Sequence, residues 1–172
     1  LKVKSACNND CIRPRFAIMN PELTYTLPAY QTACGVVDIM MHTHERYFTP
    51  VQDNEFTDEF CEGLLRTMIK LGPKAISDPY NYNVRAQIMW AGVMSHNNTV
   101  GVGRIQDSAC HRIQVMIGAK YDSAHGAGLA ESLKDYNIII SSVTPFFDAE
   151  FFEHKTDLLL LSRHGIGYNN VD

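Results

Sequence analysis

The sequence has no apolar run as long as a membrane-spanning helix requires, and its first residues lack the apolar core of a signal peptide. It also has no cluster of lysine and arginine, and 15 basic against 19 acidic residues give a formal net charge of -4. Such a chain offers no patch that would neutralise phosphates. We therefore expect a cytoplasmic protein that binds neither membranes nor nucleic acid.

Paired cysteines and a glycine-rich phosphate loop are missing as well. The odd number of cysteines, without zinc-ribbon spacing, indicates reduced thiols: Cys7, Cys11, Cys34, Cys61 and Cys110. The first two could ligate a metal, but no second pair accompanies them. Gly101 and Gly103 in VGVGR are too few, and follow no convincing strand, to bind a pyrophosphate.

The 172 residues, 45% of them hydrophobic and 20% charged, suit one globular domain, with room for a further fragment. Four segments have the apolar spacing of helices: 28–48, 54–71, 84–94 and 108–118. We expect Thr57 to cap the second helix and Gly72-Pro73 to end it. The run RFAIMNP, before Asn20 and Pro21, favours a strand leading into a turn.

The pattern changes after Ala130. Two β-rich apolar runs, Ile138 to Ile140 and Leu158 to Leu161, flank a short helical candidate from Asp148 to His154. This alternation is βαβ-like. We predict a mainly α fold, with a helical bundle over residues 1–130 followed by a short α/β segment over residues 131–172.

A carboxylate and three histidines stand out in the helical part. Asp38 and His42 are four residues apart, so on a helix they share a face and could grip one ion, although a hydrogen-bonded or solvated pair is the alternative. A second element adds His111 on a predicted helix and His125 in a loop just before glycines. Three imidazoles and one carboxylate form a coherent set of ligands for iron(II) or zinc.

Several stretches together resemble the iron-containing alcohol dehydrogenases, above all the butanol-dehydrogenase-like members. The resemblance covers residues of about 12–130 and is carried by PELTYTLPAYQTACGVVDIMMHTHERYFT, GPKA, RAQIMWAG and the segment from Asp107 to Ala130. It implies that Asp38, His42, His111 and His125 hold the catalytic metal. It also implies reversible reduction of a small aldehyde to an alcohol, with hydride from NAD or NADP.

The sequence departs from this family in three places. Val115 stands where the family usually has a second histidine, and a valine cannot relay a proton. The family's nucleotide-binding domain is not recognisable, so we expect an incomplete or fused member that binds metal but has weak or no activity alone. Residues 131–172 resemble the first domain of D-isomer-specific 2-hydroxyacid dehydrogenases, in which His164 and Asn170 would have structural roles.

The sequence leaves open two other hypotheses about function. One is a non-catalytic metal-binding or interaction fragment, whose exposed bundle faces would favour a homo-oligomer. The other is a fragment of a 2-hydroxyacid dehydrogenase.

Among single residues, we expect His44 to pack or face solvent, His96 to end a helix, Trp90 to lie in the core and Asp107 to cap the helix that carries His111.

Overall fold

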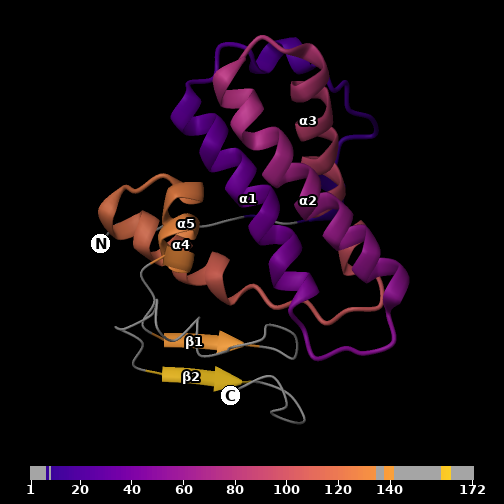
Figure 1. The fold of residues 1–172 in the computed structure, drawn as a ribbon, viewed down its shortest axis with the longest axis vertical. Coiled ribbons are helices and arrows are strands. Elements are labelled where there is room, and N and C mark those ends of the chain that lie inside the picture. The colour runs from indigo at the N-terminus through magenta and orange to yellow at the C-terminus, as the bar shows by residue number, and fades with distance from the viewer. Residues whose placement is uncertain (1–6, 8, 135–137, 142–159, 164–172) are drawn as a thin grey trace.

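The structure is a computed structural model that describes residue 7 and residues 9–134, 138–141 and 160–163. Five α-helices form most of this part (Figure 1), which confirms the mainly α fold. The elements are η1 (Asp10–Ile12), η2 (Pro21–Thr24), α1 (Ala29–Tyr47), α2 (Glu55–Ser77), α3 (Tyr82–His96), η3 (Thr99–Gly101), α4 (Ala109–Tyr121), α5 (His125–Lys134), β1 (Ile138–Ser141) and β2 (Leu160–Arg163). Among the described helices, none has both the length and the apolar character to cross a membrane.

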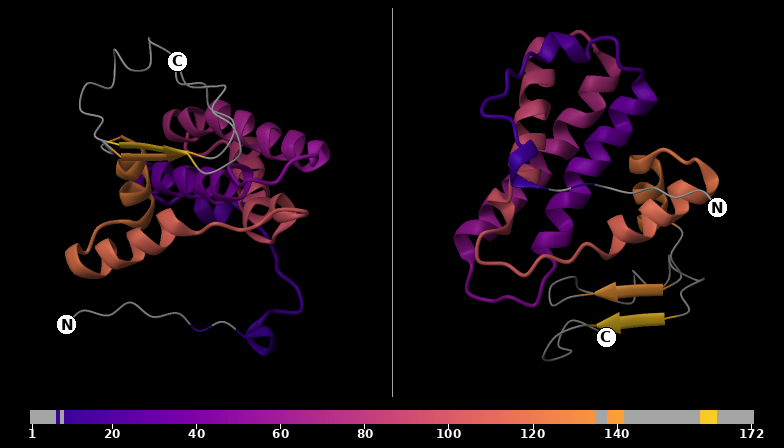
Figure 2. Two further views of the ribbon diagram at one scale, coloured as in Figure 1. Left: turned by 90° about the horizontal axis from the view of Figure 1, so that it is seen from below. Right: turned by 180° about the vertical axis from the view of Figure 1, so that it is seen from behind.

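Helices α1, α2 and α3 form a three-helix bundle in which each helix contacts the other two (Figures 1 and 2). Their apolar stripes meet in one core, because residues spaced three and four apart fall on one helix face. The buried members of this core are Val36, Cys61, Leu64, Met68, Ala91 and Val100. The buried face of α1 is therefore packed against both α2 and α3.

Helix α1 is also the support for the second half of the described chain. Helices α4 and α5 pack against each other, and α5 packs on α1. Figure 1 shows this pair, in orange, on the side of α1 that faces away from α2 and α3. The predicted buried helix over residues 28–48 is thus confirmed, with bundle packing on one side and α5 on another.

Helix α2 differs from its prediction at both ends. It runs through Pro73 to Ser77, and its capping residue is Asn54. Tertiary packing outweighs the local penalty of the proline, because Leu71 and Ala75 on either side of it are buried. The hydroxyl of Thr57 lies within the first turn and donates a hydrogen bond to the Val102 carbonyl, 3.1 Å away.

The strand predicted from RFAIMNP is wrong. Residues 16–20 have no regular secondary structure, and Phe16 and Ile18 are exposed. An isolated extended run gains its stability from a partner strand, and among the described residues the only paired strands are β1 and β2. A short apolar run alone was therefore too weak an indication.

Strands β1 and β2 pair in parallel, with Ile138 opposite Leu160 and Ser141 opposite Arg163. Strand β1 covers the first predicted apolar run, and β2 overlaps the second at Leu160 and Leu161 and begins two residues later than predicted. The helix predicted between them, over residues 148–154, lies outside the described residues, so the βαβ-like unit as a whole stays a prediction. Helix α5 extends to Lys134, slightly beyond the domain boundary predicted near residue 130.

The buried core predicts a contrast between two neighbouring residues of α2. Met68 is 0% exposed and Ile69 is 63% exposed. Met68→Ala should lower the free energy of unfolding by about 2–5 kcal/mol, because it leaves a cavity that the packed helices cannot fill. Ile69→Ala, the matched control, should change it by roughly 0.5 kcal/mol or less. Denaturant unfolding measures both, and equal losses would contradict this core.

Candidate metal centre

The four residues singled out in the sequence come from three helices. Asp38 and His42 lie one turn apart on α1, as predicted, while His111 lies in the first turn of α4. His125 is the first residue of α5 and not part of a loop, which corrects the expectation. Because α5 packs on both α1 and α4, all four side chains meet at one place.

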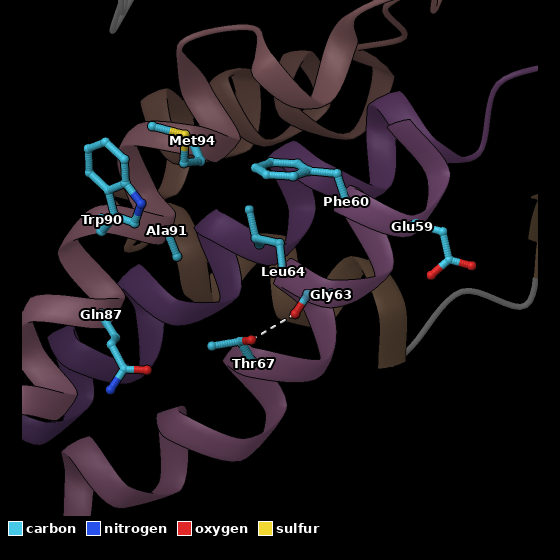
Figure 3. A pocket seen from close by; sticks show the side chains of 9 residues that line it. All are labelled: Glu59, Phe60, Gly63, Leu64, Thr67, Gln87, Trp90, Ala91 and Met94. Atoms are coloured by element: carbon cyan, nitrogen blue, oxygen red, sulfur yellow. Dashed lines mark hydrogen bonds between the residues drawn. The ribbon is translucent and has the colours of Figure 1, made fainter. Parts of the chain in front are cut away.

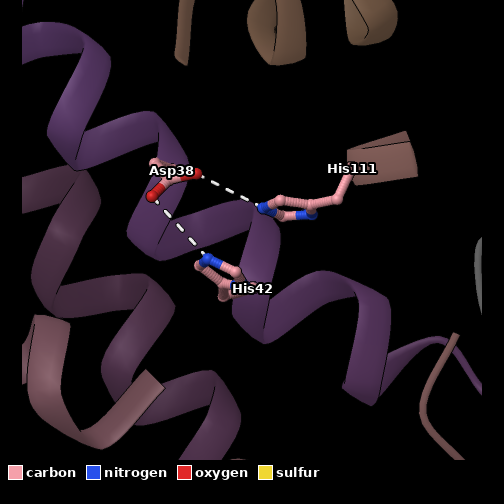
Figure 4. Close-up of side chains that lie close together, drawn as sticks. All are labelled: Asp38, His42 and His111. Atoms are coloured by element: carbon pink, nitrogen blue, oxygen red, sulfur yellow. Dashed lines mark hydrogen bonds and ion pairs between the residues drawn. The ribbon is translucent and has the colours of Figure 1, made fainter. Parts of the chain in front are cut away.

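The carboxylate of Asp38 is the centre of this cluster (Figure 4). Its Oδ1 lies 3.3 Å from Nε2 of His111 and 3.4 Å from Nε2 of His125. Its Oδ2 lies 3.7 Å from Nε2 of His42. One potential ligand atom from each of Asp38, His42 and His111 lies within 4.8 Å of the others. These three residues could therefore converge on one small cation, and His125, which is outside this group of three, joins them through its contact with Asp38.

The imidazoles also pack against one another. The rings of His42 and His111 stack with centroids 4.1 Å apart and planes 24° apart, and the centroids of His111 and His125 are 5.3 Å apart. These side chains are partly to largely buried. Close contact among three groups that can each become positive needs a compensating negative charge, and Asp38 supplies it.

Burial and neighbouring charges move the pKa values of these groups in opposite directions. Burial, together with positive charge on His111, lowers the pKa of His42 to about 4. Burial also acts to lower the pKa of His111, but hydrogen bonds to Asp38 and Glu45 outweigh it and raise that pKa to about 9. For Asp38, burial raises the pKa, but the hydrogen bond from His111 and the nearby histidines lower it overall.

Glu45 contacts the cluster and was missed by the sequence reasoning. Its Oε2 lies 2.6 Å from Nδ1 of His111, and its Oε1 accepts a 3.0 Å hydrogen bond from the His111 backbone N–H. Glu45 follows Asp38 by seven residues, which places both on one face of α1 together with His42. This seven-residue spacing could have identified Glu45 from the sequence.

Glycines at the start of α5 fix the position of His125. A Cβ atom on Gly126 would collide with the backbone carbonyl of Cys34 on α1, so only glycine permits this approach. A Cβ on Gly128 would collide with the side chain of Gln114, which is buried in α4. The amide of Gln114 donates to Ser123 and Ala124 in the turn before α5. His125 is therefore held between α1 and α4.

The other residues that the sequence analysis singled out lie around the cluster or at helix ends. His44 is half-buried, and its ring packs on Phe48 with centroids 5.4 Å apart, as expected for a residue outside the cluster. His96 is exposed at the end of α3, but its ring also lies 4.4 Å from that of His42. Asp107 caps α4 by accepting a 2.9 Å hydrogen bond from Ala109, although Ser108 occupies the cap position itself. Val115 is half-buried one turn beyond His111.

Trp90 was predicted to lie in the core but is 54% exposed. It lines a shallow hollow of about 450 Å³ between α2 and α3, opposite Phe60 and beside Met94 (Figure 3). The error arose because α3 has apolar residues on most of its faces, so its sequence does not show which face is covered. None of the four clustered residues lines this hollow.

Solved structures share this helical arrangement. The crystal structure of Escherichia coli YqhD matches with a TM-score of 0.70 and 42% identity, over 73% of this chain and 32% of that chain. The structure of NADH-dependent butanol dehydrogenase A from Thermotoga maritima matches with a TM-score of 0.68 and 38% identity, over 71% of this chain and 31% of that chain. The fold is thus that of a helical domain of such dehydrogenases.

Sequence comparison agrees with the structural likeness. The model of the Fe-containing alcohol dehydrogenase family, C-terminal part, matches residues 32–138, and the chain belongs to this family. The chain is 43% identical over 130 residues to the NADPH-dependent aldehyde reductase YqhD of Escherichia coli, covering 76% of this chain. It is 39% identical over 127 residues to NADH-dependent butanol dehydrogenase A of Clostridium acetobutylicum, covering 74% of it.

The chain spans about a third of the length of these curated relatives, with 33% of each covered. The family match confirms the resemblance stated from the sequence and extends it to residue 138, where β1 begins. The resemblance of residues 131–172 to 2-hydroxyacid dehydrogenases is not tested by these matches and stays a prediction.

The close approach of α5 to α1 predicts opposite effects for two glycines. Gly126→Ala should destabilise the protein by about 1–3 kcal/mol, because the new methyl group forces α5 away from α1. Gly35→Ala is the control, since no atom lies within 4 Å of a Cβ built there. That change should stabilise α1 by about 0.5–1 kcal/mol. Thermal and denaturant unfolding measure both, and a neutral Gly126→Ala would contradict the packing.

Proposed function

We propose that Asp38, His42, His111 and His125 bind one divalent cation, either iron(II) or zinc. The observation that carries the proposal is the convergence of three Nε2 atoms on the two carboxylate oxygens of Asp38. The donor chemistry fits, because imidazole nitrogen and carboxylate oxygen are ligands that both metals accept. Membership of a family described as Fe-containing supports iron.

We further propose that the whole protein interconverts a small aldehyde and its alcohol with a nicotinamide nucleotide. Support comes from relatives named as an NADPH-dependent aldehyde reductase and NADH-dependent butanol dehydrogenases. A metal bound at this site would supply Lewis acidity toward the substrate oxygen. In this chain, Asp38 would contribute the anionic ligand and the three histidines would be neutral ligands, with Glu45 close behind His111.

Val115 limits which residues could transfer a proton in this reaction. Its side chain, one turn beyond His111, can neither donate nor accept a proton. We therefore assign no role in proton transfer to position 115. Residues 1–130 are proposed as the metal-binding unit and residues 131–172 as a separate α/β segment.

An alternative is a non-catalytic protein that holds the metal and interacts with another chain or with a second copy of itself. The observation that favours it is the apolar hollow with exposed Trp90. The two proposals share the metal cluster and differ in whether the protein binds a nicotinamide nucleotide.

In either case we propose a reducing, cytoplasmic location, which the five free cysteines support.

The first test is metal content. Purified protein stripped with a chelator and reloaded anaerobically with iron(II), or in air with zinc, should retain one equivalent by elemental analysis. His111→Ala should lose most of it, because His111 contacts the other ligands and stacks on His42. His44→Ala removes an imidazole from the same region without touching the cluster, and should bind like the unmodified protein. Equal metal content in all three proteins would refute the site.

The second test is the pH dependence of metal binding. The pKa of His111 is raised to about 9, so below that pH a proton occupies the nitrogen that the cation needs. Metal affinity should therefore rise about tenfold per pH unit between about pH 6 and about pH 8.5. His42 adds no such competition near neutral pH, since its pKa is lowered to about 4. Competition titration against a chelator of known affinity measures this slope, and a flat profile would contradict the charge state.

A further inference from the structure

We propose that Glu45 is a positioning residue, which fixes the rotation and the tautomer of the His111 imidazole so that Nε2 faces Asp38. The inference rests on the proposed function in one respect, namely that the cation binds at this Nε2. Glu45 is not one of the four proposed ligands. It acts on the cation only through His111.

Three contacts tie Glu45 to the segment that carries His111. Its backbone carbonyl accepts a 3.3 Å hydrogen bond from the backbone N–H of Asp107. Its carboxylate accepts the backbone N–H of His111 at Oε1, 3.0 Å away, and contacts the ring Nδ1 of the same residue at Oε2, 2.6 Å away. One residue of α1 thus holds both the main chain and the side chain of His111.

The backbone contact explains why the carboxylate stays in place. The first N–H groups of a helix have no partner within that helix, and His111 is the third residue of α4. Glu45 satisfies this N–H from outside the helix, where the positive end of the helix dipole also favours a carboxylate. Its side chain is only 7% exposed, so water competes weakly for its oxygens.

The ring contact determines which nitrogen is available. A neutral imidazole carries its proton on one nitrogen and its free electron pair on the other, and a carboxylate beside Nδ1 keeps the proton there. In the metal-free protein Nε2 donates a hydrogen bond to Asp38, 3.3 Å away. A cation bound there would displace that proton and take the electron pair of Nε2. A half-turn of the ring would break the short contact to Glu45. The two carboxylates therefore hold the ring from opposite sides.

The contact could instead serve only to fasten α4 to α1, and the experiment separates the two roles. Cobalt(II) is titrated into the metal-free protein and its visible absorption is followed. Glu45→Gln keeps one acceptor oxygen but places an amide NH₂ where the second acceptor was, and Glu45→Ala removes both. Glu62→Gln is the matched control, since that carboxylate also binds two partners, Tyr47 and Arg66, away from the cluster.

We expect cobalt(II) affinity to fall about 10–100-fold in both Glu45 variants, with an altered absorption spectrum for the bound ion, and to stay unchanged in Glu62→Gln. Thermal unfolding of the metal-free proteins is measured alongside. A Glu45→Gln protein that unfolds at the unmodified temperature but binds cobalt(II) more weakly supports positioning. A folded Glu45→Gln or Glu45→Ala protein with unmodified affinity and spectrum overturns it.

A second readout keeps this inference separate from the metal proposal. Proton and nitrogen NMR of the metal-free protein should show a strongly hydrogen-bonded Nδ1–H resonance for His111, which disappears in Glu45→Ala and persists in Glu62→Gln. If the unmodified protein binds no cobalt(II) but this pattern is present, the proposed function fails and the action of Glu45 on the ring stands. If the resonance is absent from the unmodified protein, the inference is overturned.

Discussion

One carboxylate among three imidazoles is the interaction on which the functional site depends. Asp38 lies within 3.7 Å of a ring nitrogen from each of three histidines, and those histidines come from three helices. Without its negative charge, the stacked rings of His42 and His111 would repel each other whenever both were protonated. Burial and the neighbouring His111 lower the pKa of His42, whereas hydrogen bonds to Asp38 and Glu45 raise the pKa of His111.

Helix α1 organises both the core and the site. Val36 faces α2 and α3 in the apolar core, whereas Asp38, His42 and Glu45 face α4 and α5. A polar stripe inside a packed helix is costly unless its charges find partners. Here those partners lie on the neighbouring helices, so the same contacts that satisfy the stripe also bring the distant histidines together.

The sequence predicted the helices well because their apolar spacing is a local property. It failed where packing between distant segments decides the outcome. Pro73 lies within α2 because Leu71 and Ala75 are buried on either side of it, and Trp90 is half-exposed because no described element covers that face of α3. These facts depend on contacts that no single segment reveals.

The candidate site likewise combines features that local spacing predicts with features that depend on packing between distant segments. Asp38 and His42 could be paired from helical spacing alone. His111 and His125 were added as further imidazoles from a second element, and the family resemblance then supported the set of four. Glu45 lay on the same stripe and could have been identified by extending the spacing one further turn. The collision that Gly126 avoids with Cys34 could not have been predicted, since it depends on how closely two backbones approach.

The attachment of α4 and α5 has a consequence for motion. These two helices contact each other and reach the bundle chiefly through α1, while the core is built from α1, α2 and α3. Cooperative units with few buried contacts open at lower free energy than the core does. A local opening of the α4–α5 hairpin that left the three-helix core folded would separate the two histidines on the hairpin from the aspartate and histidine on α1.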